Sequence, residues 1–572
     1  MIPYQVLQIA RFCKEAGILN IVASPGSRSA PILLSFVRMG GFIIHMEMDE
    51  RSAAYKAIGL SLGLNKPVAI FCTSGTAVLN YGPAIAEAFY QNLPLFVFTA
   101  DRPPESIDQN DGQAVRQNGI FHLHTKFSGT LPTSESGSEV FTFTRRLLNQ
   151  AYHSATSLPQ GPVHLNVPLR EPLYPQEPVD FGPINASNQW MEPMVSHQKL
   201  EREVLSPLLD LWNKTGSRLL IAGQHRPDDE LSNAIKALSE YSHCPVSGDF
   251  LHNLHNHPGL IKSADSFPEI FWNSPDLEPE ILITIGAGLL SKSTRAFLKK
   301  SKPRYHWHIQ EKGFPADPNG SITHHIQADP TWFLTKLGEA SYFTVEEKQN
   351  ESKRYFQIWK DAEQKAREIT EEFAGNVAWS DLASVEILTR ALSVNLVLFA
   401  GNSMSVRYLQ WLSFRIPSGI PVFSNRGTSG IDGCLSTSIG LALAHPDRII
   451  LAVLGDMSFV YDRNALWTKS VPSNLRVVVL NNAGGNIFRI IPGSGSIPEL
   501  DEFFELNQPF SARNAALESG MDYYEARDGD YLAFVWKEFI SNRGPAVIEC
   551  FTDRVENATV VKQFKQYLKA KW

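Results

Sequence analysis

The stretch "LAVLGDMSFVYDRNALW", Leu451–Trp467, decides the fold, because it begins as a buried strand and stops abruptly at Gly455-Asp456. A short apolar run closed by glycine is typical of a parallel strand, and ligands of open α/β sheets bind at the carboxyl ends of such strands. Asp456 is therefore placed to meet a ligand. Taken alone, it is more simply explained as a cap of the following helix.

The next strand, in "LRVVVLNNAGGNIF", also ends on polar residues, Asn481 and Asn482. Mg²⁺ prefers carboxylate, amide and carbonyl oxygens, so Asp456, the Asn482 side chain and a carbonyl near Gly484 would supply about half of an octahedral shell. An Asn-Asn-Ala-Gly turn without a metal is the alternative. Two adjacent polar strand ends favour the metal, and a phosphate would be held by metal and amides because the chain has no Walker motif.

The composition describes a soluble globular protein of several domains, with 572 residues, 43% hydrophobic and 19% charged. A net charge of -7 without a basic run argues against a nucleic-acid partner. The five scattered cysteines form no C-x-x-C pair, which indicates buried thiols in a reducing compartment. The N-terminal stretch is unlike a secretory leader, because Arg11, Lys14 and Glu15 interrupt its apolar residues, and no run of about 18 apolar residues occurs in the sequence. We therefore expect no membrane span and a cytoplasmic enzyme.

Strands and helices alternate in three blocks, which predicts three α/β domains with doubly wound parallel sheets, at residues 1–180, 197–345 and 377–572. The proline-rich stretch 168–193 is interpreted as a linker. The charged stretch 345–375 predicts a solvated connecting helix. The last strands of the first and third blocks, "GPVHLNVP" and "GPAVIECF", are loosely alike, which hints that these two domains are related.

Together, "GDMSFVYDRNALW" and "NNAGGNIF" resemble the diphosphate-binding signature of thiamine-diphosphate enzymes. The resemblance implies that the three domains are pyrimidine-binding, central and diphosphate-binding. It also implies that Asp456, Asn482 and the Gly484 carbonyl bind Mg²⁺ or Mn²⁺, which holds the diphosphate of thiamine diphosphate.

Such enzymes need a glutamate in the pyrimidine-binding domain, and Glu50 in "HMEMDERSAAYKAIGLSLG" fits that place. A carboxylate bonded to the aminopyrimidine ring favours the imino tautomer, whose nitrogen removes the C2 proton. The alternative is a first-turn helix residue favoured by the macrodipole. In this superfamily the glutamate and the diphosphate site come from different subunits, which implies a homodimer or dimer of dimers with the active site at the interface.

A narrower resemblance rests on "SPGSRSAPI", "TSGTAVLNYGPAIAEA", "TADRPPE", "GNSMSVR" and "SNRGTSGIDGCLSTSIG". The chain resembles the 2-succinyl-5-enolpyruvyl-6-hydroxy-3-cyclohexene-1-carboxylate synthases of menaquinone biosynthesis over nearly all of the first and third blocks, and only loosely in the middle block. That family decarboxylates 2-oxoglutarate and adds the succinyl-semialdehyde carbanion to isochorismate in a 1,4 sense. The product is the compound in the family name, with CO₂.

Both substrates are dianions, for which guanidinium groups are the best partners. Four arginines each follow a predicted strand, although each alone could be a surface residue. The resemblance implies these substrate-site residues: Ser27, Arg28, Arg102, Gln113, Lys292, Arg407 and Arg426. Gln113 would also act in catalysis by orienting an intermediate, and Lys292 precedes Ser293 where some relatives have arginine.

Two further residues are implied to touch the cofactor. Ser403 would contact it, and Ile431 would wedge between its two rings, although core packing would also explain an isoleucine there. The His324-His325 pair is like a pair in pyruvate decarboxylases, but it stands in the wrong block, and we expect a loop.

Two alternative functions remain at this point. Another thiamine-dependent 2-oxoacid decarboxylase, or an acetolactate synthase, would accept smaller monoanions and would not need four arginines at strand ends. A non-catalytic binding protein on this fold would have lost Glu50 or Asp456, and both are present.

Overall fold

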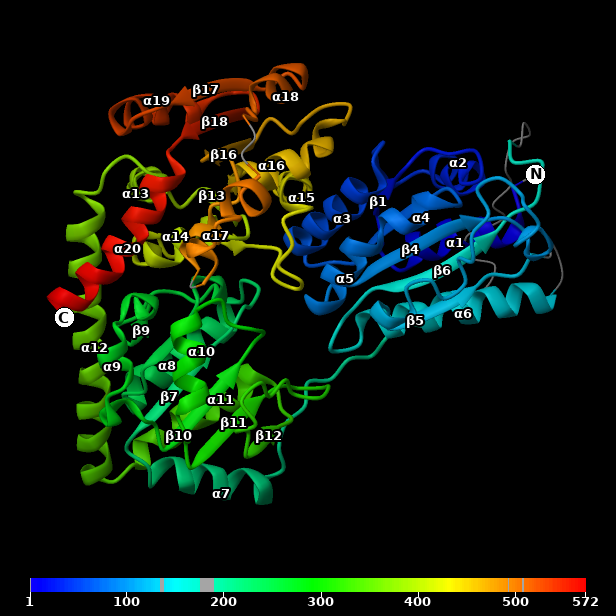
Figure 1. Ribbon diagram of the computed structural model, residues 1–572. Coiled ribbons are helices and arrows are strands. Elements are labelled where there is room, and N and C mark those ends of the chain that lie inside the picture. Colours follow the sequence, from blue (N-terminus) through cyan, green and yellow to red (C-terminus); the bar gives the residue numbers. More distant parts are fainter. Residues whose placement is uncertain (1, 134–137, 175–189, 492, 507–508) are drawn as a thin grey trace.

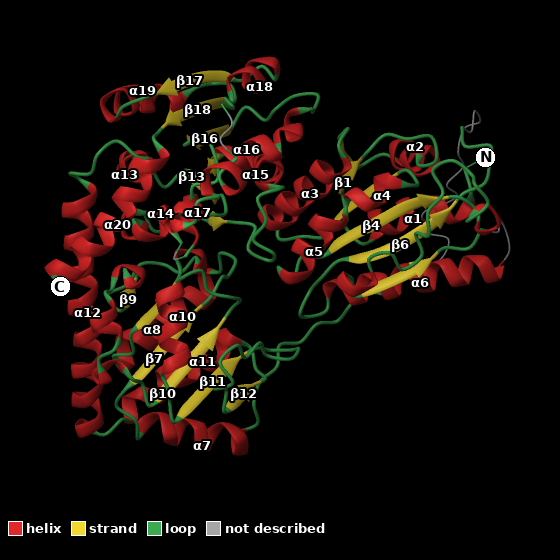
Figure 2. Cartoon of the chain, viewed as in Figure 1, coloured by secondary structure: helices red, strands yellow, loops and turns green. Residues whose placement is uncertain are grey.

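The computed structural model describes residues 2–133, 138–174, 190–491, 493–506 and 509–572. It contains three six-stranded sheets, and every strand pair in them is parallel (Figure 1). Helices cover the sheets (Figure 2), and we call the parts of the chain around them the first, central and third lobes. The predicted α/β class is confirmed, whereas the domain bounds stay predictions.

Side chains alternate between the two faces of the sheet in the first lobe, and helices bury both faces. Its strands in spatial order are β2 (Ile43–Met46), β1 (Asn20–Ala23), β3 (Val68–Cys72), β4 (Leu95–Asp101), β6 (Val163–Pro168) and β5 (Phe127–Thr130). One face packs on α1 (Tyr4–Glu15), α2 (Ala30–Met39) and α6 (Ser138–Thr156). The other packs on α3 (Glu50–Leu64), α4 (Thr76–Asn80) and α5 (Gly82–Tyr90).

The third lobe repeats this strand order, which supports the expected relation between the two lobes. Its strands are β14 (Val422–Phe423), β13 (Leu396–Ala400), β15 (Ile449–Gly455), β16 (Leu475–Asn481), β18 (Ala546–Phe551) and β17 (Asp522–Ala526). One face packs on α13 (Asp381–Arg390), α14 (Met404–Trp411), α19 (Gly529–Ser541) and α20 (Arg554–Lys571). The other packs on α15 (Cys434–Ala444), α16 (Asp456–Tyr461) and α18 (Arg513–Glu518).

The central lobe has the strand order of a dinucleotide-binding sheet. Its strands are β12 (His324–Ile326), β11 (Tyr305–Ile309), β10 (Ile281–Ile285), β7 (Arg218–Ala222), β8 (Val246–Gly248) and β9 (Leu260–Ile261). Its main helices are α7 (Arg202–Asn213), α8 (Asp229–Ser242), α10 (Lys292–Lys300) and α11 (Pro330–Ala340). In such sheets a dinucleotide binds at the point where the strand order reverses. Here the backbone of the chain fills that point: the Gly223 amide donates to the Ile285 carbonyl, and a Cβ on Gly223 would lie 1.7 Å from the Ala287 carbonyl oxygen.

The prediction of a loop at His324-His325 is wrong, because these residues begin β12 at the edge of the central sheet. The strand pairs in parallel with β11, with His324 opposite Trp307 and His325 opposite His308. Three residues are too few to show an alternating pattern in the sequence, and the pairing with β11 determines the strand.

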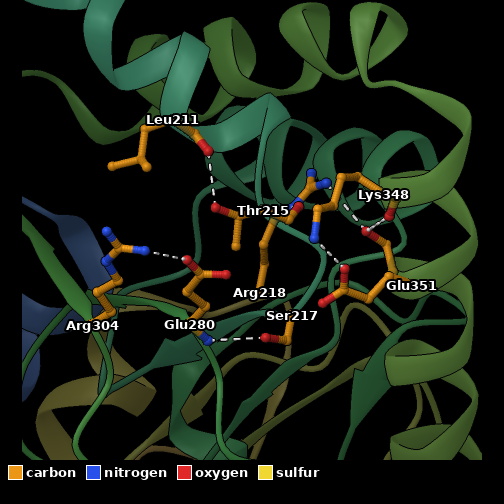
Figure 3. Close-up of polar contacts among 9 residues, drawn as sticks. Leu211, Thr215, Ser217, Arg218, Glu280, Arg304, Lys348 and Glu351 are labelled. Atoms are coloured by element: carbon orange, nitrogen blue, oxygen red, sulfur yellow. Dashed lines mark hydrogen bonds and ion pairs between the residues drawn. The ribbon is translucent and has the colours of Figure 1, made fainter.

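Polar contacts fix the start of strand β7 (Figure 3). The buried Arg218 guanidinium donates to the Thr215 carbonyl at 2.8 Å and lies 4.4 Å from the centre of the Trp212 ring. Its second branch reaches Ser352 in helix α12 (Glu346–Ala374). Helix α12 confirms the predicted connecting helix. One of its faces is buried, however, because Trp359 lies in the core of the central lobe.

The first and third lobes meet where α3 and α15 cross side by side (Figure 1). A Cβ on Gly59 would lie 2.1 Å from the Thr437 carbonyl oxygen, and one on Gly440 would lie 2.1 Å from the Lys56 carbonyl oxygen. Only glycine permits this approach of the two backbones. One hydrophobic core therefore runs through both lobes.

Three smaller expectations concern the cysteines, membrane spans and the linker. All five cysteines are buried and free, as predicted. No helix in the described part of the chain combines the length and the apolar character that crossing a bilayer needs. Residues 175–189 of the predicted linker lie outside the described residues, and Trp190 packs against Tyr152 with ring centres 4.3 Å apart.

Candidate active site

Asp456 lies at the carboxyl end of β15, as predicted, and it is the first residue of α16 rather than its cap, which is Gly455. Its two oxygens accept hydrogen bonds from the Met457 amide at 2.7 Å and the Gly484 amide at 2.9 Å. Burial raises the pKa of Asp456 to about 7, and the nearby Asp381 carboxylate adds to the shift. A bound cation would stabilise the ionised form of the Asp456 carboxyl group. The explanation of Asp456 as a helix cap involves no cation.

Asn482 and Gly484 bring further oxygens to Asp456. The Asn482 amide nitrogen donates to Asp381 at 2.9 Å, and its buried oxygen accepts no hydrogen bond from any described residue. A Cβ on Gly484 would lie 2.1 Å from the Glu505 carbonyl oxygen, so this position requires glycine. The carboxylate, the unpaired amide oxygen and the Gly484 carbonyl form a donor set that fits Mg²⁺ or Mn²⁺.

The predicted cofactor residues Ser403 and Ile431 belong to loops that contact each other. Ser403 precedes α14 with φ of 72°, and its neighbour Asn402 donates to the Gly430 carbonyl at 2.7 Å. The Ser458 hydroxyl of α16 donates to the Ile431 carbonyl at 3.1 Å. Ile431 is partly exposed and, among the described residues, lies in neither core of the third lobe, so core packing does not explain it.

Arg407 and Arg426 lie next to these loops. The Arg407 guanidinium donates to the Ser403 carbonyl, and Arg426 donates to the Asn402 side chain at 3.0 Å. Burial lowers the pKa of Arg426, and the positive charges of Arg407 and Arg295 lower it further. The three guanidinium groups therefore form a cationic cluster suited to a carboxylated ligand.

Arg28 and Arg102 form a second cationic pair in the first lobe. The buried Arg28 donates to the Leu169 carbonyl at 2.9 Å, and burial lowers its pKa, as does the charge of Arg102. Arg102 donates to the Gly112 carbonyl at 2.7 Å, beside Gln113. The structure therefore brings these three predicted residues to one side of the lobe. Gln113 and Ser27 are exposed.

Glu50 is the first residue of α3, which Asp49 caps by accepting a bond from the Ser52 amide at 3.2 Å. Both the functional and the first-turn interpretations of Glu50 fit this position. Burial raises the pKa of the half-buried Glu50, and its charge in turn raises the pKa of Tyr81 and Cys72. A carboxyl group of raised pKa in a partly buried place suits hydrogen bonding to a ring nitrogen.

The predicted residues form two half-sites in one chain. Asp49 accepts from the Asn464 side chain at 2.9 Å and Arg51 donates to the Tyr461 carbonyl at 2.7 Å, so the neighbours of Glu50 contact the last residue of α16 and the segment after it. Across the described ranges, no hydrogen bond or ion pair joins Glu50 to Asp456 or Asn482.

Two residues at the site were missed by sequence reasoning, Asp381 and Arg295. Asp381 orients Asn482, but in the sequence it has only the signature of a first-turn helix residue after a serine cap. Arg295 stands one turn into α10 and the predicted Lys292 at its start, and both are exposed. The position of Arg295 after a strand of the central sheet is the sequence signal that could have indicated it.

Comparisons with known proteins agree with this geometry. Residues 7–120 match the family model "Thiamine pyrophosphate enzyme, N-terminal TPP binding domain", and residues 410–550 match its C-terminal counterpart. A 2-succinyl-5-enolpyruvyl-6-hydroxy-3-cyclohexene-1-carboxylate synthase of Porphyromonas gingivalis is 36% identical over 96% of this chain and 95% of its own length.

Proteins of the same name from two other organisms are similarly close. The Cytophaga hutchinsonii protein is 35% identical over 98% of both chains, and the Desulfotalea psychrophila protein is 34% identical over 96% of this chain and 98% of its own. The alignments span the central lobe as well as the two lobes that the family models match. The chain therefore belongs to the 2-succinyl-5-enolpyruvyl-6-hydroxy-3-cyclohexene-1-carboxylate synthase family of thiamine-diphosphate enzymes.

Proposed function

We propose that this enzyme decarboxylates 2-oxoglutarate and adds the remaining four-carbon unit to isochorismate in a 1,4 sense, in menaquinone biosynthesis. CO₂ leaves, and the product is 2-succinyl-5-enolpyruvyl-6-hydroxy-3-cyclohexene-1-carboxylate. The names of relatives aligned over nearly the whole chain support the reaction. The observation that carries the cofactor chemistry is the convergence of Asp456, Gly484 and the unpaired Asn482 oxygen at one sheet edge.

In this proposal the third lobe holds the cofactor by its diphosphate end. Asp456, Asn482 and the Gly484 carbonyl bind Mg²⁺ or Mn²⁺, which neutralises the diphosphate and keeps Asp456 ionised. Ser403 contacts the cofactor, and Ile431 supports its bent form. Thiamine diphosphate, when bound, supplies the acceptor for the electron pair that decarboxylation releases.

Glu50 holds the other end of the cofactor in this proposal. The Glu50 carboxyl group would hydrogen-bond to the aminopyrimidine ring and would hold or accept a proton there. The neighbours of Glu50 in this chain contact residues 461–464, away from Asp456. This supports an active site completed by a second copy of the chain, as a homodimer or a dimer of dimers.

The arginines bind the carboxylates of the two dianions. Arg407 and Arg426 act from the third lobe, with Arg295 of the central lobe near them, and Arg28 and Arg102 act from the first lobe, near Ser27 and Gln113. Gln113 orients the reacting group. Glu171 and Asp111 lie 3.4 Å from Arg28 and Arg102, so the charge balance alone does not distinguish dianions from monoanions, and the names of the relatives are what favours the dianion reaction. A cytoplasmic location stays a prediction.

Two variants test the division of labour. Asp456→Ala removes a metal ligand, and we expect thiamine diphosphate binding, measured by calorimetry with Mg²⁺, to weaken at least about 100-fold. Glu50→Gln leaves the metal site intact, so binding should change less than about tenfold, while turnover of 2-oxoglutarate falls at least about 100-fold. Tight binding by the Asp456 variant, or normal turnover by the Glu50 variant, would overturn the assignment.

A further inference from the structure

A buried carboxylate of the first lobe forms hydrogen bonds to an active-site loop of the third lobe. Glu87 in α5 is fully buried and lies 0% exposed. Its oxygens accept hydrogen bonds from the Gly427 amide at 2.7 Å, the Thr428 amide at 2.6 Å and the Thr428 hydroxyl at 2.6 Å. A fourth bond, at 2.5 Å, comes from the Gln91 side chain one turn along the same helix.

The gripped segment is the loop of residues 424–433, which joins β14 to α15 and carries both Arg426 and Ile431. A Cβ on Gly427 would lie 2.5 Å from the Glu87 carbonyl oxygen, so the loop approaches α5 as closely as a glycine allows. Gln91 also donates to the Ser424 carbonyl at 3.2 Å. The loop is therefore attached to α5 at its start and again just after Arg426.

The charges around Arg426 show why the loop needs an anchor. Arg407 and Arg295 lie close enough to act on Arg426, and like charges repel, whereas the carboxylates of Asp249 and Glu87 attract it. Arg426 makes one hydrogen bond to the Asn402 side chain, at 3.0 Å, which a loop movement would break. Glu87 opposes the repulsion in two ways, because it binds the next two amides and places a negative charge behind the guanidinium group.

This set of hydrogen bonds requires a carboxylate. Every partner of Glu87 named above is a donor, and an ionised carboxylate offers acceptors only. Glutamine at this position would turn one NH₂ group toward an N–H donor. Buried donors and acceptors without partners are costly, so this exchange of one atom should loosen the loop while leaving the packing of α5 unchanged.

We propose that Glu87 is a positioning residue for the substrate site: by holding Gly427 and Thr428 from the first lobe, it fixes Arg426 where a substrate carboxylate binds. The role of Arg426 rests on the proposed function, whereas the hold on the loop does not. Docking of the first lobe on the third thus determines the geometry of the cationic cluster formed by Arg295, Arg407 and Arg426.

The test uses the full-length protein carrying Glu87→Gln. We expect hydrogen exchange at the Gly427 and Thr428 amides to accelerate at least about tenfold. We also expect KM for one of the two dianions to rise about tenfold, with kcat changed less than about threefold, since a ground-state contact is weakened. Thiamine diphosphate affinity should stay within about threefold, because Ser458 holds the Ile431 end of the loop separately at 3.1 Å, and Asp456 and Asn482 lie outside the loop.

A matched control is Glu311→Gln in the central lobe. Glu311 is also a buried carboxylate, and it accepts a backbone bond from Gln198 at 2.9 Å, far along the chain. This variant should lose stability without a change in KM or in exchange at Gly427. If Glu87→Gln does not fold, Thr428→Val, at an exposed position, removes only the hydroxyl donor and should shift exchange and KM in the same direction by a smaller factor.

The outcomes separate the two claims. Unchanged exchange at Gly427 and Thr428 in a folded Glu87→Gln protein overturns the hold on the loop, whether or not the wild type has the proposed activity. Faster exchange with an unchanged KM for both dianions overturns the positioning role. A wild type that turns over neither dianion overturns the proposed function, and faster exchange in the variant would still support the hold on the loop.

Discussion

The side-chain nitrogen of Asn482 donates to Asp381 at 2.9 Å, which leaves the Asn482 oxygen buried and unpaired among the described residues. Asp381 also accepts a bond from the Thr552 hydroxyl at 2.6 Å, so both its oxygens are fixed. An amide group can turn either way, and this contact decides which of its two atoms is left unpaired. A carboxylate therefore sets the orientation of the proposed metal ligand Asn482.

Asp381→Ala should weaken thiamine diphosphate binding about 10–100-fold, because the Asn482 amide then has no partner that fixes its orientation. Asp381→Asn is the control. The Thr552 hydroxyl can reverse to accept from the new NH₂ group, which leaves an oxygen for Asn482, so binding should stay within about tenfold. Calorimetric titration with Mg²⁺ present measures both, and equal losses in the two variants would contradict the orienting role.

The glycine crossing of α3 and α15 should tolerate no side chain. Gly440→Ala places a methyl group 2.1 Å from the Lys56 carbonyl oxygen, and we expect it to lower the free energy of unfolding by about 3 kcal/mol. Gly288→Ala, with no atom within 4 Å of the added carbon, should change it by less than about 1 kcal/mol. Urea denaturation compares them, and similar stabilities would contradict the close crossing.

Asp462 predicts a pH dependence of stability. It is fully buried, accepts from the Ser436 amide at 2.6 Å and hydroxyl at 2.8 Å, and burial raises its pKa to about 7. Because the folded-state pKa lies above the ordinary value, Asp462 stabilises the fold at low pH, and this stabilisation is lost as the pH rises through about 7.

Asp462→Asn cannot ionise and can keep both bonds if the Ser436 hydroxyl reverses. Its free energy of unfolding relative to wild type should therefore rise by about 2 kcal/mol between about pH 5 and about pH 8. Denaturant titrations of the two proteins without cofactor, at matched pH values, give this difference. A difference that does not change with pH would show that Asp462 is ionised in the folded protein throughout this range.

Arg295, rather than Lys292, should contribute to substrate binding from the central lobe. Both side chains are exposed, but of the two only Arg295 carries a charge that lowers the pKa of Arg407 and Arg426. Arg295→Ala should raise KM for one dianion about tenfold, as expected for loss of a charged contact, and Lys292→Ala should change it less than about threefold. Steady-state kinetics with each substrate varied in turn measures this, and the opposite ranking would restore Lys292 as the contact.

Strand ends carried most of what the sequence could predict. Apolar runs closed by Gly455-Asp456 and Asn481-Asn482 placed the proposed metal ligands at one edge of the sheet, because parallel strands point their carboxyl ends the same way. The three-residue strand at His324 was missed because its pairing depends on β11.

Glu87 and Asp381 were beyond the sequence for a different reason. Glu87 contacts residues more than 300 positions away, and Asp381 contacts Asn482 across 101 positions. Such contacts depend on how lobes and helices dock, and no local spacing records them. Residues that touch the ligand follow strand-end patterns, whereas residues that position them are visible only in the fold.

The most direct test of the proposed reaction is CO₂ release from 2-oxoglutarate by the purified protein with thiamine diphosphate and Mg²⁺, with and without isochorismate and with pyruvate as a control. We predict that isochorismate accelerates release and that one cyclohexene adduct forms for each CO₂. Release from pyruvate alone would contradict the assignment of the dianion substrates, and the absence of turnover with either oxoacid would contradict catalysis by this site.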